Sequence, residues 1–108
     1  MPNEVPPPAM HVHEFEGSTM LAEECDERHN HRFAGVTSEL IPLPSDHVHG
    51  FFTNTDFFDH HHEVVGLTGP AIDVGNNKHV HFVNFFTTLD DGHVHQYIFA
   101  TLILSPLV

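Results

Sequence analysis

The sequence predicts an elongated, repeat-built, all-β and solenoid-like protein made from six copies of one short strand motif. Twelve of the 13 histidines occur in His-x-His pairs, and each pair begins a nine-residue unit of constant pattern. The key positions of the unit are two residues apart, so they lie on one face of a β-strand. The six pairs are His11/His13, His29/His31, His47/His49, His60/His62, His79/His81 and His93/His95.

Two further positions define the unit. The residue four places after the first histidine is aromatic or valine: Phe15, Phe33, Phe51, Val64, Val83 and Tyr97. The residue eight places after it is always threonine: Thr19, Thr37, Thr55, Thr68, Thr87 and Thr101. Unit starts are separated by 18, 18, 13, 19 and 14 residues, so the connections vary while the motif does not. We therefore expect the motif to form the regular structural element and the connections to form loops. We expect the threonines to make hydrogen bonds with the backbone at the ends of strands.

Each unit is expected to form a strand entered through a turn. Valine, a good strand former, is the middle residue of four His-x-His pairs, and turn-type residues such as Ser45-Asp46 and Asp90-Asp91-Gly92 precede the motifs. Short extra strands are predicted at 40–41, 71–74 and 102–104, with nearby prolines restricting them to short or edge positions. The chain then divides into a Pro-rich N-terminal arm, residues 1–10, and a six-unit repeat domain, residues 11–108.

The phenylalanines predict a homo-oligomer. Phe15, Phe33 and Phe51 share the histidine face and are expected in the core. Seven others lie off that position, and a lone chain would expose them as an unusual apolar patch. They are Phe52, Phe57, Phe58, Phe82, Phe85, Phe86 and Phe99. Burial between three chains explains them most simply, so we expect a homotrimer.

Composition excludes several classes of function. Three Lys and Arg stand against 15 Asp and Glu, a formal charge of −12, which argues against binding nucleic acid or an anionic membrane surface. No apolar run is long enough to cross a membrane, and the first ten residues lack the features of a signal peptide. Cytoplasmic location is therefore the default expectation. The single Cys25 excludes an internal disulfide and a cysteine-based metal site.

The paired histidines predict binding of transition-metal ions. Two histidines two residues apart on a strand point to one side, and imidazole suits Zn, Cu, Fe and Ni rather than Mg or Ca. All twelve paired histidines are candidate ligands, while contributions from His61 and Cys25 stay open. Two pairs of one chain would give a tetrahedral, zinc-like site. One pair from each of three chains would give an octahedral six-His site on a central axis, which suits Fe(II), Ni or Co better. Hydrogen-bonded histidine ladders without metal are the remaining alternative.

The unit resembles known sequences. Residues 29–37, His-Asn-His-Arg-Phe-Ala-Gly-Val-Thr, and residues 60–71 resemble the YmaF family of small bacterial proteins. They also resemble the repeats in the receptor-binding tips of phage long tail fibres. The tail-fibre resemblance implies three intertwined β-rich chains, a virion or extracellular fibre, and His-x-His pairs that hold ions octahedrally on the axis. The sequence departs from the motif at Thr53, Phe85 and Phe99, which replace its glycine.

These observations predict a metal-binding structural protein, namely a metal-stapled trimeric β-fibre or a filament-forming or adhesive module with an unknown surface receptor. The alternative is metal storage or buffering through exchangeable histidine sites. We do not expect an enzyme, because six equivalent sites indicate scaffolding and no general base recurs beside the pairs.

Overall fold

The structure is a computed structural model that describes residues 10–23 and 28–104. Within these ranges the chain forms β-strands and no helix, which confirms the all-β prediction and leaves no helix that could cross a membrane. Most of the predicted N-terminal arm, and Cys25, lie outside the described residues. The strands are β1 (Glu14–Ser18), β2 (Arg32–Val36), β3 (Leu40–Leu43), β4 (Asp46–Asn54), β5 (Glu63–Leu67), β6 (Ala71–Gly75), β7 (Lys78–Phe86) and β8 (Gln96–Ala100).

Consecutive repeat units pair as antiparallel hairpins. Strand β1 pairs with β2, β4 with β5, and β7 with β8. The predicted extra strands at 40–41 and 71–74 are confirmed as β3 and β6, which add edges to β4 and β7. Pro42 lies in β3, where an edge position tolerates the missing N–H. The strand predicted at 102–104 is wrong, because Leu102 N–H instead donates a single hydrogen bond to the Glu14 carbonyl.

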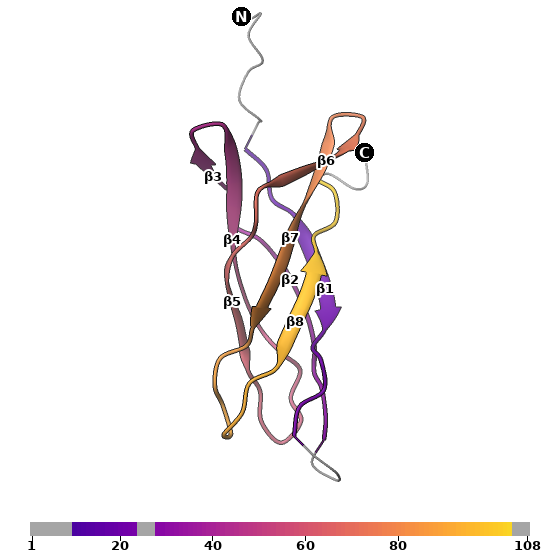
Figure 1. The fold of residues 1–108 in the computed structure, drawn as a ribbon, viewed down its shortest axis with the longest axis vertical. Coiled ribbons are helices and arrows are strands. Elements are labelled where there is room, and N and C mark those ends of the chain that lie inside the picture. The colour runs from indigo at the N-terminus through magenta and orange to yellow at the C-terminus, as the bar shows by residue number, and fades with distance from the viewer. Residues whose placement is uncertain (1–9, 24–27, 105–108) are drawn as a thin grey trace, which may run out of the picture.

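The three hairpins surround one core (Figure 1). A few isolated backbone hydrogen bonds link each hairpin to its neighbours, among them Asp56 N–H to Arg32 O, Gly69 N–H to Phe82 O, and Met20 N–H to Gln96 O. The last unit therefore lies beside the first. The predicted solenoid is wrong, because units of a solenoid contact only their sequence neighbours. The predicted elongation is confirmed by principal extents of 59 × 27 × 16 Å.

The core lies between the ends of the hairpins and is packed by complementary sizes across paired strands. Phe15 lies opposite Gly35, Phe33 opposite Gly17, and Phe51 opposite Gly66. At two of the three positions where the motif's glycine is replaced, the opposite residue is valine: Val64 faces Thr53 and Val83 faces Phe99. At the third position, Phe85 faces Tyr97 and is itself exposed. The buried apolar residues are Phe15, Phe33, Val48, Phe51, Val64, Val83, Tyr97 and Phe99.

The expected exposure of the remaining phenylalanines is confirmed with one exception. Phe52, Phe57, Phe58, Phe82, Phe85 and Phe86 are between 47% and 74% exposed in the single chain. Phe99 is buried instead, and its ring stacks on Phe15 with 5.1 Å between centroids. Phe99 lies opposite the small Val83, whereas Phe85, at the same position of its own unit, lies opposite Tyr97 and stays exposed.

Gly35 provides a test of this packing. A Cβ at Gly35 would lie 2.7 Å from Cζ of Phe15, which is 2% exposed and cannot move aside. We expect Gly35→Ala to lower the free energy of unfolding by about 1–3 kcal/mol, because overpacking forces core side chains to shift. Gly50→Ala is the matched control, since its nearest contact would be 3.5 Å, and equal thermal melting of the two variants would contradict the expectation.

Candidate metal centres

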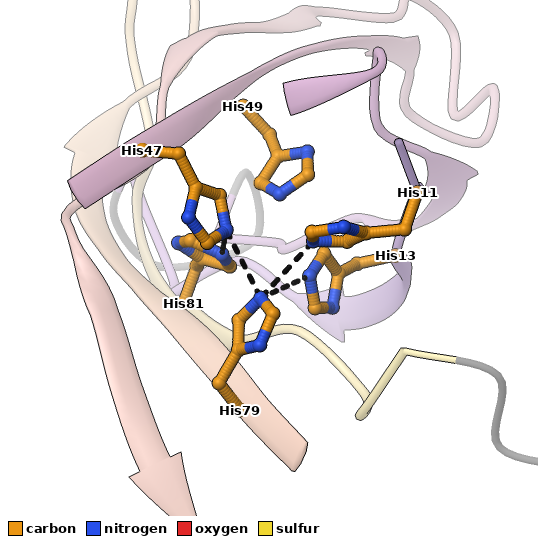
Figure 2. Close-up of side chains that lie close together, drawn as sticks. All are labelled: His11, His13, His47, His49, His79 and His81. Carbon is orange, nitrogen blue, oxygen red and sulfur yellow. Dashed lines mark hydrogen bonds between the residues drawn. The ribbon is translucent and has the colours of Figure 1, made fainter. Parts of the chain in front are cut away.

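The twelve paired histidines gather in two clusters of six. We call His11, His13, His47, His49, His79 and His81 site 1, and His29, His31, His60, His62, His93 and His95 site 2. Each hairpin gives one pair to each site, because its antiparallel strands start at opposite ends of the molecule. In site 1 the rings converge from three separate chain segments on a common centre (Figure 2).

The ring nitrogens are spaced like the vertices of an octahedron. The potential ligand atoms of each site all lie within 4.8 Å of one another. Contacts between Nε2 atoms measure 3.0 Å for His47–His79, 3.1 Å for His11–His79 and 3.3 Å for His31–His60. An octahedron with metal–nitrogen bonds of about 2.1 Å has edges of about 3.0 Å and diagonals of about 4.2 Å. The six donors thus fit one octahedrally coordinated ion per site.

The conserved spacing of histidine and threonine within the units fixes the backbone of the second histidine of each pair. His13 N–H donates to Thr37 Oγ1 at 3.0 Å, and Thr37 N–H donates back to the His13 carbonyl at 2.9 Å. The same exchange joins the other five second histidines to the threonine of their antiparallel partner unit. The predicted structural role of the threonines is confirmed. This hydrogen bond also explains why several pairs lie just before a strand begins. The backbone N–H of the second histidine donates to a threonine hydroxyl instead of to a backbone carbonyl of the neighbouring strand.

The second histidines also have a fixed tautomer. Their Nδ1 atoms lie 2.9–3.0 Å from the carbonyl of the residue that follows a motif threonine. A carbonyl only accepts, so Nδ1 carries the proton and Nε2 keeps its lone pair. Nε2 points into the cluster, as a hydrogen-bonded metal-ligating imidazole does. The six carbonyls belong to Met20, Ser38, Asp56, Gly69, Thr88 and Leu102.

Hydrogen bonds alone do not account for the clusters. Nε2 of His79 lies 3.0–3.1 Å from Nε2 of His11, His13 and His47, yet it carries at most one hydrogen. Nε2 of His49 is buried without a hydrogen-bond partner among the described residues. Lone pairs at these distances repel unless a cation lies between them, which weighs against the ladder without metal.

Burial keeps these rings neutral. The second histidine of each pair is 0–1% exposed, and desolvation lowers the pKa of His13, His49 and His95 to about 4. Desolvation, followed by repulsion from neighbouring rings, lowers the pKa of His79 to about 3. A neutral imidazole is the form that coordinates a metal.

These shifts predict loss of the fold in acid. Below pH 6.5 the unfolded chain binds more protons than the folded chain, so the free energy of unfolding decreases as the pH decreases. Burial alone places most of this loss between pH 6.5 and pH 4, by which point more than about 3 kcal/mol is lost, and His79 extends it towards pH 3. A bound ion would move this pH range lower. Far-ultraviolet circular dichroism from pH 7.5 to pH 3 measures it, and a constant spectrum would contradict the expectation.

The structure brings together all twelve predicted ligands, but in an arrangement that differs from both predicted site types. One chain supplies six histidines to each site, instead of four from one chain or two from each of three chains. His61 is exposed and belongs to neither cluster. The sequence did not reveal the six carbonyls, because no residue type marks them, and it predicted Asp90 and Asp91, which lie beside site 2, only as turn residues.

The fold and both sites can now be compared with known proteins. Searches of curated proteins and of solved structures returned no match. The family described as spore germination protein GerY/YamF matches residues 8–103, which covers both histidine clusters and all six units. The chain therefore belongs to the YmaF family.

Proposed function

We propose that the protein binds two transition-metal ions per chain, each held octahedrally by the six Nε2 atoms of one site. The observation that carries this proposal is the spacing of those atoms. They form octahedral edges of 3.0–3.3 Å in site 1 and site 2 alike, and the second histidine of each pair directs its Nε2 lone pair inward. Six nitrogen donors favour Fe(II), Ni or Co over Zn, which prefers four ligands; Cu is also compatible with imidazole.

The role of the ions in this proposal is structural. Each ion would join all three hairpins, since each hairpin contributes one pair to each site. Six protein ligands fill an octahedron and leave no position for substrate or activated water, whereas catalytic metals keep one open. We therefore infer a scaffold rather than an enzyme, and slow metal exchange rather than storage. The family is described as a spore germination protein, and we propose spore germination as the setting of this scaffold.

Metal content tests the proposal. Native mass spectrometry and elemental analysis of protein produced with Fe(II), Ni(II) or Co(II) are expected to give two ions per chain. Three per chain would support four-His sites. Ions that exchange within seconds and retain water ligands would support storage, and the absence of stoichiometric metal would contradict metal binding altogether.

We further propose that chains associate, as a homotrimer that can extend into an intertwined fibre or filament. Exposed aromatic residues support association, notably Phe57 and Phe86, which are 74% and 52% exposed. Because one chain completes each site, metal coordination gives no reason for threefold assembly. Light scattering at micromolar concentration is expected to report three chains, and a monomeric mass with metal bound would refute the proposal.

A further inference from the structure

The two sites differ in the charges behind their ligands, and we propose that site 2 binds its ion more tightly than site 1 and retains it last. The difference arises from carboxylates that face the outer ring nitrogens, Nδ1, of the site 2 histidines. This inference rests on the proposed function, because it concerns the relative affinity of the two proposed sites.

Four carboxylates approach outer nitrogens of site 2. Asp56 Oδ1 lies 3.2 Å from Nδ1 of His31, which also donates to the Asp56 carbonyl at 3.0 Å. The other three distances to Nδ1 are 3.4 Å for Asp91 and His60, 3.6 Å for Asp90 and His62, and 3.4 Å for Glu23 and His93.

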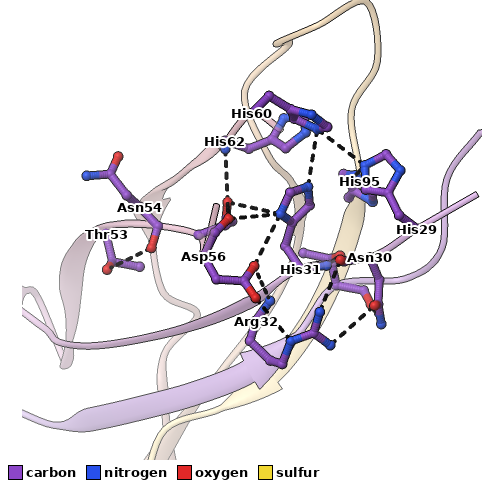
Figure 3. A network of polar contacts seen from close by, with 12 residues as sticks. His29, Asn30, His31, Arg32, Thr53, Asn54, Asp56, His60, His62 and His95 are labelled. Atoms are coloured by element: carbon purple, nitrogen blue, oxygen red, sulfur yellow. Dashed lines mark hydrogen bonds and ion pairs between the residues drawn. The ribbon is translucent and has the colours of Figure 1, made fainter. Parts of the chain in front are cut away.

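Two of these carboxylates are held in place. Arg32 donates to Asp56 through its backbone N–H at 3.0 Å and through Nε at 3.2 Å, so the carboxylate faces His31 with little freedom (Figure 3). Asp90 accepts a hydrogen bond from the Thr88 hydroxyl, two residues away. Because these two carboxylates are already held in position, they lose less conformational entropy when they interact with a metal-ligating histidine.

Site 1 provides an internal comparison. His13, His49 and His81 donate to backbone carbonyls at 2.9 Å, with threonine hydroxyls as the other groups near Nδ1. His47 and His79 are the other two site 1 histidines compared here. Among the described residues, one carboxylate approaches an outer nitrogen of these five histidines: Asp46, which lies 3.7 Å from Nδ1 of His47. Five histidines of site 2 therefore have four carboxylates beside their outer nitrogens, whereas five histidines of site 1 have one. His11 and His29 are left out of this comparison.

Charge gives this contrast a direction. Six neutral imidazoles leave the two positive charges of a divalent ion uncompensated in a buried site. A carboxylate beyond an imidazole offsets that charge and makes the ring a more basic ligand, and loss of such partners costs about 10–100-fold in metal affinity. The site 2 carboxylates are 32–57% exposed, so solvent weakens each one, and we expect a difference of about tenfold or more between the sites.

The experiment removes metal from the fully loaded protein. Co(II)-loaded chains are equilibrated with increasing competing chelator, native mass spectrometry counts the ions, and paramagnetic shifts of assigned NMR signals identify the site that stays occupied. At one ion per chain, signals near Thr88 and Asp56 are expected to remain shifted, while those near Ser38 and Gly69 lose their shifts.

Asp91→Asn tests the cause. Asp91 has φ +53°, which asparagine tolerates well, and its carbonyl keeps the 3.1 Å contact with His93 Nδ1. We expect this variant to lower the affinity of site 2 severalfold and leave site 1 unchanged. Glu16→Gln, which removes the same charge from the exposed side of β1, is the control and should change neither site.

The outcomes separate the two proposals. If the chains hold no cobalt, the proposed function fails. If both sites hold cobalt and release it at the same chelator concentration, or if Asp91→Asn weakens both sites equally, metal binding stands and the carboxylate inference is wrong. Earlier release from site 2 would also overturn it.

Discussion

Complete removal of metal is expected to unfold the protein. Apparent metal-binding free energies in small structural sites are about 10–16 kcal/mol, whereas whole domains have stabilities of about 5–15 kcal/mol. Without the ions, each site leaves six imidazole lone pairs facing one another at the centre of the fold. The three hairpins are otherwise joined by few backbone hydrogen bonds, so the core contacts alone must hold them.

Chelator at pH 7.5, followed by circular dichroism and elemental analysis, measures this effect. Loss of β-structure should parallel loss of metal over hours, because the second histidines are 0–1% exposed and block direct access to the ion. Chelator already saturated with metal is the control. A metal-free chain with an unchanged spectrum and melting temperature would mean that the histidines do not hold the structure together.

Deletion of one His-x-His pair is expected to halve the metal content. His47→Ala combined with His49→Ala removes two of six ligands from site 1 and none from site 2, so one ion per chain should remain. Loss of one ion should lower the melting temperature by more than about 20 °C, since each kcal/mol corresponds to several degrees in a domain of this size.

The reciprocal variant, His60→Ala with His62→Ala, should also retain one ion, at site 1. His61→Ala is a matched control, because His61 lies between these two residues but is exposed and outside both clusters. If either double variant loses both ions, the sites are one cooperative unit rather than two separable ones.

Local structure was predictable where the unit's own chemistry determined it. The spacing of His11, His13 and Phe15 placed them on one inward face, and the invariant threonine indicated a strand-end hydrogen bond, which Thr37 makes. The exposure of Phe57 and Phe86 was also predictable, because they fall outside the inward positions.

The partners of each pair were not predictable from the spacing. A pair on a strand has the same geometry whether other pairs come from its own chain or from neighbours, so His11 could not reveal that His47 and His79 complete its site. The deciding fact is the closure that brings Leu102 beside Glu14, a contact between residues remote in sequence. Phe99 was misjudged because its burial depends on the small Val83 across the hairpin.

The sharing of each site among three hairpins has a consequence for the entropy of the unfolded chain. An ion at site 1 or site 2 would act as a three-way cross-link that closes two loops of about 30 residues, each restricting the unfolded chain by about 4 kcal/mol on the scale used for disulfides. The chain has a single cysteine and cannot form an internal disulfide. Cross-links of this kind would survive thiol reductants that open disulfide-bonded domains, and they would respond to chelators and acid instead.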